Sequence, residues 1–131
     1  MNANAQSIVI TGALFAFLGV ALGAFGAHAL KARLTAEMLA VYQTGVQYHL
    51  AHALGIVLIG VLVQRLPASR WLPVAAWTMT TGVIVFSGSL YALSISGIRM
   101  LGAVTPLGGL ALLAAWLLVA VGVAKAGAAA P

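Results

Sequence analysis

The stretch TGVQYHLAHALGIVLIGVLV, residues 44–63, decides the fold class, because it is a long apolar run that contains no Asp, Glu, Lys or Arg. About 20 such residues in a helix cross a hydrocarbon core about 30 Å thick. A helix is required because lipid offers no partner to the backbone N–H and C=O groups, which must pair within their own segment. The stretch therefore predicts a transmembrane helix that is followed by Arg65.

Three further runs of this kind flank it, at residues 7–29, 72–95 and 105–124. We therefore expect an all-α, four-helix transmembrane bundle that forms a single integral membrane domain, residues 1–131. The fourth span begins with Thr105 and Pro106, which suit a helix start. The second helix could begin as early as Thr35, which would place Glu37 in its first turn and Arg65 in its last, as the helix dipole favours. A turn lying on the membrane surface over residues 30–38 is the alternative.

The composition agrees with a lipid environment. Of the 131 residues, 63% are hydrophobic and 5% are charged, whereas about 25% of a soluble domain is charged. The net charge of +5 does not indicate nucleic acid, because the six Lys and Arg are scattered and form no basic stripe. They are better interpreted as flanks of the spans. Cysteine is absent, which excludes disulfides and thiolate metal sites.

The first span is expected to stay in the protein, because the leading MNANAQS carries no Lys or Arg and the apolar run is longer than that of a signal peptide. Four spans place both termini on one side. The basic residues divide evenly between the two sides, so the positive-inside rule does not decide the orientation. The free amino terminus and Glu37 favour cytoplasmic termini, and a dual topology stays open.

Small residues indicate close helix packing in three of the spans. Small side chains let helices approach one another in lipid, and serine can also form hydrogen bonds between helices. A substrate path lined by hydroxyl groups is the alternative interpretation. The residues expected to pack helices are Gly19, Gly23 and Gly26 of the first span, Ser87, Gly88 and Ser89 of the third, and Gly108 and Gly109 of the fourth.

The histidines are the main candidates for a functional site, because polar side chains at membrane depth are costly and face protein or a water-filled cavity. His28 ends the first span, and His49 and His52 are about 60° apart on the second helix. We expect all three in the same half of the membrane, with Gln47 and Tyr48 beside them. A hydrogen-bonded polar cluster, a metal or haem site built from the three imidazoles, and a proton relay remain open.

Four ordered motifs carry a family resemblance: GALFAFLGVALGAFGAHALK, YQTGVQYHLAHALG, FSGSLYALSISG and TPLGGLALLAAW. In this order the chain resembles the YgdD-like family of small multi-pass inner-membrane proteins, over residues 12–116. The resemblance implies four spans and a place in the bacterial inner, or plasma, membrane. It implies no activity, because the family is uncharacterised in function.

The sequence favours a small accessory or assembly protein that packs against partners in the lipid bilayer, with a homo-oligomer or another membrane protein as the partner. Catalysis is disfavoured, since Glu37 is the only carboxylate side chain and no nucleophile–base set or phosphate-binding loop is visible. We expect no cofactor unless His28, His49 and His52 bind a metal or haem. The remaining alternative is a small oligomeric transporter or channel.

Overall fold

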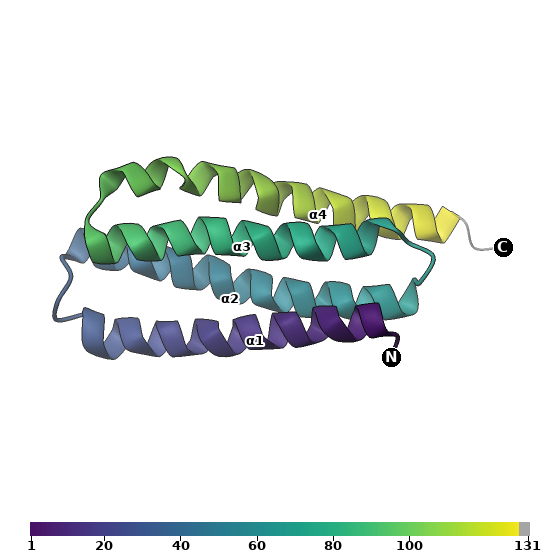
Figure 1. Ribbon diagram of the computed structural model, residues 1–131, viewed down its shortest axis with the longest axis horizontal. Coiled ribbons are helices and arrows are strands. Elements are labelled where there is room, and N and C mark those ends of the chain that lie inside the picture. Colours follow the sequence, from purple (N-terminus) through teal and green to yellow (C-terminus); the bar gives the residue numbers. More distant parts are fainter. Residues whose placement is uncertain (129–131) are drawn as a thin grey trace.

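The computed structural model describes residues 1–128 and shows four long helices: α1 (Ala3–Phe25), α2 (Ala36–Arg65), α3 (Trp71–Ser96) and α4 (Thr105–Ala128) (Figure 1). A π-helical turn, η1 (Gly26–Leu30), extends α1, and a 3-10 turn, η2 (Arg99–Ala103), precedes α4. All four helical segments are long and apolar enough to cross a membrane. The expected all-α, four-helix membrane fold is confirmed.

The second helix is longer than the expected span of residues 44–63. It starts at Ala36, because the hydroxyl of Thr35 caps it by accepting a hydrogen bond from the backbone N–H of Met38. Glu37 lies in its first turn and Arg65 in its last, so the earlier of the two possible starts is the observed one. This added length places His49 and His52 near the middle of the helix.

The other helix ends have local causes. Gly97 adopts a positive φ of 72° and donates its N–H to the carbonyl of Leu93, which stops α3. At the start of α4, the hydroxyl of Thr105 lies 2.7 Å from that of Ser89. This interaction ties the end of α3 to the start of α4. The helix begins at Thr105, as expected from the sequence.

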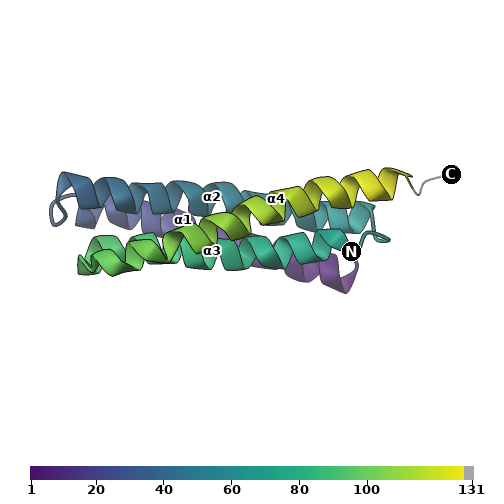
Figure 2. The ribbon, with the colours of Figure 1, turned by 90° about the horizontal axis from the view of Figure 1, so that it is seen from above.

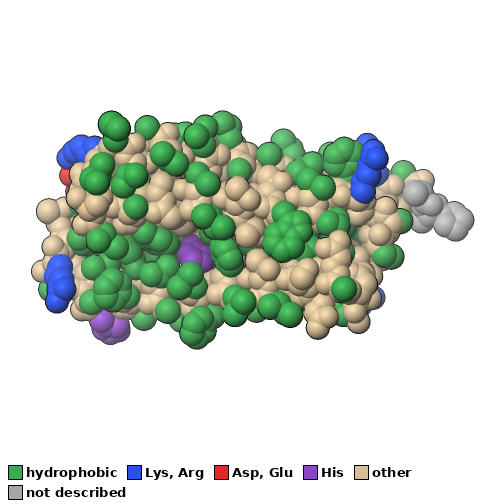
Figure 3. All heavy atoms as spheres, in the orientation of Figure 1, with side chains coloured by type: hydrophobic (Ala, Val, Ile, Leu, Met, Phe, Trp, Pro, Cys, Tyr) green, Lys and Arg blue, Asp and Glu red, His purple; other side chains and the backbone are tan. Residues whose placement is uncertain are grey.

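Consecutive helices run antiparallel and pack along one another, with both termini at one end (Figures 1 and 2). The pair α2 and α3 is central, and α1 and α4 lie outside it. Lys and Arg side chains gather at the two ends of the molecule, while hydrophobic side chains dominate the length between them (Figure 3). This distribution matches a protein that crosses a membrane lengthwise.

The close-packed core occupies the half of the molecule that contains the termini. It combines the first turns of α1 with the second half of α2, the first half of α3 and the middle of α4. Its largest fully buried side chains are Ile8, Ile56, Ile59, Leu72, Met79 and Val83. His49 and His52 border two cavities, which are described below.

Glycines set the distances between neighbouring helices. A Cβ at Gly12 would lie 2.8 Å from the backbone nitrogen of Val57, so α1 and α2 touch there through their backbones. A Cβ at Gly82 would lie 3.1 Å from the backbone nitrogen of Leu112, which joins α3 to α4 in the same way. Neither glycine was among those expected from the sequence to pack helices.

The GxxxG face of α1 also packs inside the chain. A Cβ at Gly19 would meet the Leu50 side chain at 2.7 Å, and one at Gly26 would meet the Tyr42 ring at 2.5 Å. Gly23 similarly approaches the Val46 side chain on α2. This face is therefore covered by α2.

Two of the other expected packing glycines behave differently. At Gly88 no described atom lies within 4 Å of an added Cβ, so the structure gives this glycine no packing role. At Gly109 an added Cβ would be in ordinary contact with the Phe86 ring, 3.7 Å away. Gly108, by contrast, lies directly against the backbone of Phe86.

Candidate functional site between the second, third and fourth helices

The three histidines do not share one site. His28 is exposed in η1, whereas His49 and His52 are buried near the middle of α2. Gly19 packs against His49, and the rise from Gly19 to His28 is about 13 Å along the helix axis. Figure 3 shows histidine side chains at two separate places, one at an end and one recessed near the middle. The expectation of three neighbouring histidines is therefore wrong.

The reason is the early start of α2. Eight extra residues at its beginning move His49 and His52 away from the end of the molecule where His28 lies in η1, after α1. Within the described residues 1–128, no group of three or more His, Asp or Glu side chains is placed to hold a metal ion. Gln47, also expected in the cluster, is exposed on α2.

His49 belongs to a polar contact between α2 and α3. Its Nδ1 lies 3.0 Å from the hydroxyl of Tyr91, and its ring packs edge-on against Phe15 of α1 at 5.7 Å between centroids. Its Nε2 is buried and forms no hydrogen bond with any described residue. The side chain borders a cavity of about 190 Å³ between α1 and α3.

Two further hydrogen bonds connect the same three helices. Tyr42 of α2 donates its hydroxyl hydrogen to the carbonyl of Leu22 in α1 at 2.6 Å. Ser87 of α3 donates to the carbonyl of Gly45 in α2 at 2.8 Å. Both donors are buried side chains bonded to backbone oxygens, so they fasten the helices to one another.

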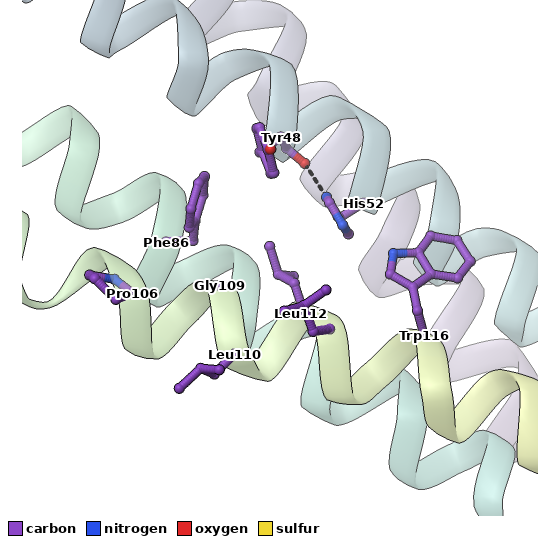
Figure 4. Close-up of a pocket in the computed structure, with 9 residues that line it drawn as sticks. Tyr48, His52, Phe86, Pro106, Gly109, Leu110, Leu112 and Trp116 are labelled. Carbon is purple, nitrogen blue, oxygen red and sulfur yellow. Dashed lines mark hydrogen bonds between the residues drawn. The ribbon is translucent and has the colours of Figure 1, made fainter.

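His52 faces a second, larger cavity on the other side of α2. This cavity has a volume of about 480 Å³, within the usual range of about 300–1,000 Å³ for small-molecule sites. It extends along α4 from the beginning of the helix at Pro106 to Trp116, near its middle. Its lining residues, several of which are drawn in Figure 4, are Tyr48, His52, Phe86, Pro106, Gly109, Leu110, Leu112, Leu113 and Trp116.

The cavity opens at the lipid-facing surface. Leu110 and Leu113 are 63% and 65% exposed, and Tyr48 and Trp116 are also exposed. All four lie in helices that are long and apolar enough to cross the membrane. A molecule dissolved in the hydrocarbon phase therefore has a direct route into the cavity from the side.

Aromatic rings form much of the wall. The rings of Tyr48 and Phe86 lie 4.5 Å apart between centroids, and Tyr48 stacks on His52 at 5.8 Å with an interplanar angle of 15°. The Trp116 ring is 6.1 Å from that of His52. The indole nitrogen of Trp116 lies on the edge of the ring that faces His52 and Leu112 (Figure 4).

The protonation pattern of His52 follows from its partner. Its Nδ1 lies 2.7 Å from the carbonyl oxygen of Tyr48, one turn earlier in α2. A carbonyl can only accept a hydrogen bond, so Nδ1 carries the hydrogen, and in this tautomer Nε2 has the free lone pair. Nε2 forms no hydrogen bond within the described part of the chain. Figure 4 shows this side of the ring directed into the cavity.

Sequence reasoning identified His52 and Tyr48 but missed Phe86, Gly109 as a cavity residue, and Trp116. The sequence does not show whether a single aromatic residue in an apolar helix faces lipid or a cavity, because aromatic residues occur at both kinds of position. The one available clue was the spacing of His52 and Tyr48, which places them on the same face of α2.

These observations define the class of the protein: a four-helix integral membrane protein with a lateral cavity at the level of its central histidines. The chain belongs to the family described as "Protein of unknown function (DUF423)", whose model matches residues 22–109. The resemblance to the YgdD-like family is confirmed, because the YgdD protein of Escherichia coli is among the relatives of this chain. No solved structure matches the chain.

Named relatives cover nearly the whole chain. The UPF0382 membrane protein YwdK of Bacillus subtilis is 45% identical over 117 residues, which is 89% of this chain and 95% of the relative. The UPF0382 inner membrane protein YgdD of Escherichia coli is 40% identical over 119 residues, covering 91% of this chain and 90% of the relative. A UPF0382 membrane protein of Staphylococcus haemolyticus is 41% identical over 118 residues.

Proposed function

We propose that this protein binds a small apolar molecule, taken from the lipid phase, in the cavity between α2, α3 and α4. The observation that carries the proposal is the cavity of about 480 Å³ itself, which opens towards lipid and has a polar nitrogen at its wall. Small-molecule sites are mostly apolar, with a few placed polar groups. The accessory role expected from the sequence fits a protein that holds such a molecule for a membrane partner.

The test uses Trp116 as a reporter. Changing Trp71 and Trp77 to Phe leaves Trp116 as the only tryptophan of the original three. Its fluorescence is measured in lipid vesicles during titration with 4-bromodecylbenzene, whose bromine quenches tryptophan on contact. We expect quenching that saturates, because the cavity holds a limited number of molecules.

The matched pair of variants is Gly109→Leu and Gly88→Leu in this background. Leu at position 109 places its side chain beside the Phe86 ring and narrows the cavity, so the saturable quenching should weaken strongly. Leu at position 88 has open space around it and does not touch this cavity, so quenching should stay as in the parent. Quenching that rises linearly in all three proteins, as for free partitioning into lipid, would refute the proposal.

We infer that the protein lies in the bacterial inner membrane with both termini in the cytoplasm. The Escherichia coli relative is named an inner membrane protein, which supports this location, and Glu37, which lies at the end of the molecule opposite the termini, supports the orientation. Alkaline phosphatase, which is active only outside the cytoplasm, reports the side. A fusion after Gly127 should be inactive and one after Ser96, between α3 and α4, should be active. The reverse pattern would contradict this orientation.

A further inference from the structure

Two nitrogens with opposite hydrogen-bonding roles lie at the wall of the cavity. Nε2 of His52 is an acceptor, because Nδ1 carries the hydrogen that is donated to the Tyr48 carbonyl. The indole N–H of Trp116 can only donate, and Figure 4 shows its nitrogen facing the same space. The two rings come from different helices, and their centroids are 6.1 Å apart.

A hydroxyl group complements this pair. Its hydrogen can be donated to Nε2 of His52 while its oxygen accepts the N–H of Trp116. One hydroxyl placed between the two rings would therefore satisfy both nitrogens, whereas a carbonyl would leave the His52 lone pair without a donor. Polar groups without partners are costly in an apolar site, so the two nitrogens favour a ligand with a hydroxyl group over one that lacks it.

The rest of the lining restricts what carries that hydroxyl. None of the nine lining residues is Lys, Arg, Asp or Glu, so a carboxylate or phosphate would enter a low-dielectric site without a counter-charge. The Tyr48 and Phe86 rings offer flat faces for offset or edge-on ring packing. A cavity of about 150 Å³ holds a benzene ring. The volume of about 480 Å³ therefore leaves room for a substituted ring and the start of its tail.

We propose that the cavity selects a neutral, lipid-soluble phenol, the class that includes quinols, by binding its ring hydroxyl between His52 Nε2 and the indole N–H of Trp116. This rests on the proposed function, because it specifies the ligand of the same cavity. The hydroxyl lies at the level of the middle of α2, and the apolar tail leaves between Leu110 and Leu113 towards lipid.

The experiment compares two probes that differ by one hydroxyl, 4-decylphenol and decylbenzene. Binding of tritiated 4-decylphenol to the full-length protein in nanodiscs is measured, and each unlabelled probe is used as competitor. For the wild-type protein we expect unlabelled 4-decylphenol to displace half of the bound label at a concentration at least about tenfold lower than decylbenzene requires. This readout does not depend on tryptophan fluorescence, so Trp116 itself can be changed.

Two variants remove one hydrogen-bonding partner each and keep an aromatic ring. His52→Phe removes the acceptor and Trp116→Phe removes the donor, so each should reduce the preference for the phenol several-fold. Binding of decylbenzene should persist in both, which shows that the cavity is still formed. His28→Phe and Trp77→Phe are the controls, because neither residue lines this cavity, and both should keep the wild-type preference.

The outcomes separate the two proposals. If the wild-type protein binds both probes equally, or if both variants retain the full preference, the hydroxyl assignment is wrong while the apolar cavity stands. If neither probe binds saturably to the wild-type protein, the proposed function fails, and the assignment fails with it. Loss of decylbenzene binding in one variant alone would show that this ring shapes the cavity, and the other variant then decides the assignment.

Discussion

Gly108→Ala is expected to destabilise the protein by about 1–3 kcal/mol, the usual cost of overpacking a well-packed interface. An added Cβ at position 108 would lie 2.7 Å from the Cα of Phe86 and 2.8 Å from its Cβ. The obstructing atoms include the backbone of α3, which cannot turn aside as the end of a side chain can. The helices α3 and α4 would therefore have to separate at the beginning of α4.

Gly109→Ala is the matched control, because it makes the same chemical change one residue later. Its Cβ would meet the Phe86 ring at 3.7 Å, an ordinary contact. Both variants gain the helix propensity of alanine over glycine, about 1 kcal/mol, so the difference between them isolates the clash. The free energy of unfolding is measured by denaturant titration in mild detergent. Equal stability of the two variants would contradict the backbone contact between α3 and α4.

Tyr91→Phe should lower the free energy of unfolding by about 1–3 kcal/mol, the penalty for leaving a buried polar group without a hydrogen-bond partner. The Tyr91 hydroxyl provides the hydrogen bond of His49 at 3.0 Å, and the other ring nitrogen of His49 is already buried without one. After the substitution, the whole imidazole is buried in apolar surroundings. Thermal unfolding in detergent measures the loss.

Tyr48→Phe provides the control for this substitution. Tyr48 is 42% exposed, and its ring hydroxyl forms no hydrogen bond with another described residue. It should change the stability by less than about 0.5 kcal/mol. Combining Tyr91→Phe with His49→Leu should recover part of the loss, because removing both partners leaves no unsatisfied group. A double variant as unstable as the sum of its parts would show that His49 and Tyr91 act independently.

The fold followed from the sequence because hydrophobic length is a local property. The spans at residues 72–95 and 105–124 differ from α3 and α4 by a few residues at their ends. The possible early start of the second helix also came from local signals, the places of Glu37 and Arg65 relative to the helix dipole, and α2 does begin there, at Ala36 with Thr35 as its cap. It was the shorter span, residues 44–63, that placed the histidines at the wrong depth.

The cavity could not be predicted, because it depends on how the helices are rotated and how closely they approach. Those quantities are set by backbone contacts such as that of Gly108 with Phe86. In the sequence, a glycine that makes such a contact cannot be told from one that makes none, such as Gly88. Trp116 is separated from His52 by the rest of α2, the whole of α3 and the start of α4, so only the folded chain brings their rings to 6.1 Å. The polar pair therefore has no sequence signature.

Photo-crosslinking is the most direct test of a ligand cavity between α2, α3 and α4. A decylphenol that carries a diazirine on its ring is activated in vesicles containing the wild-type protein, and the labelled residues are mapped by mass spectrometry. Binding in the cavity predicts adducts concentrated on Tyr48, Phe86 and Trp116, and their loss when unlabelled 4-decylphenol is added. Adducts spread over lipid-facing residues of α1, such as Leu14 and Phe17, and unaffected by the competitor would contradict it.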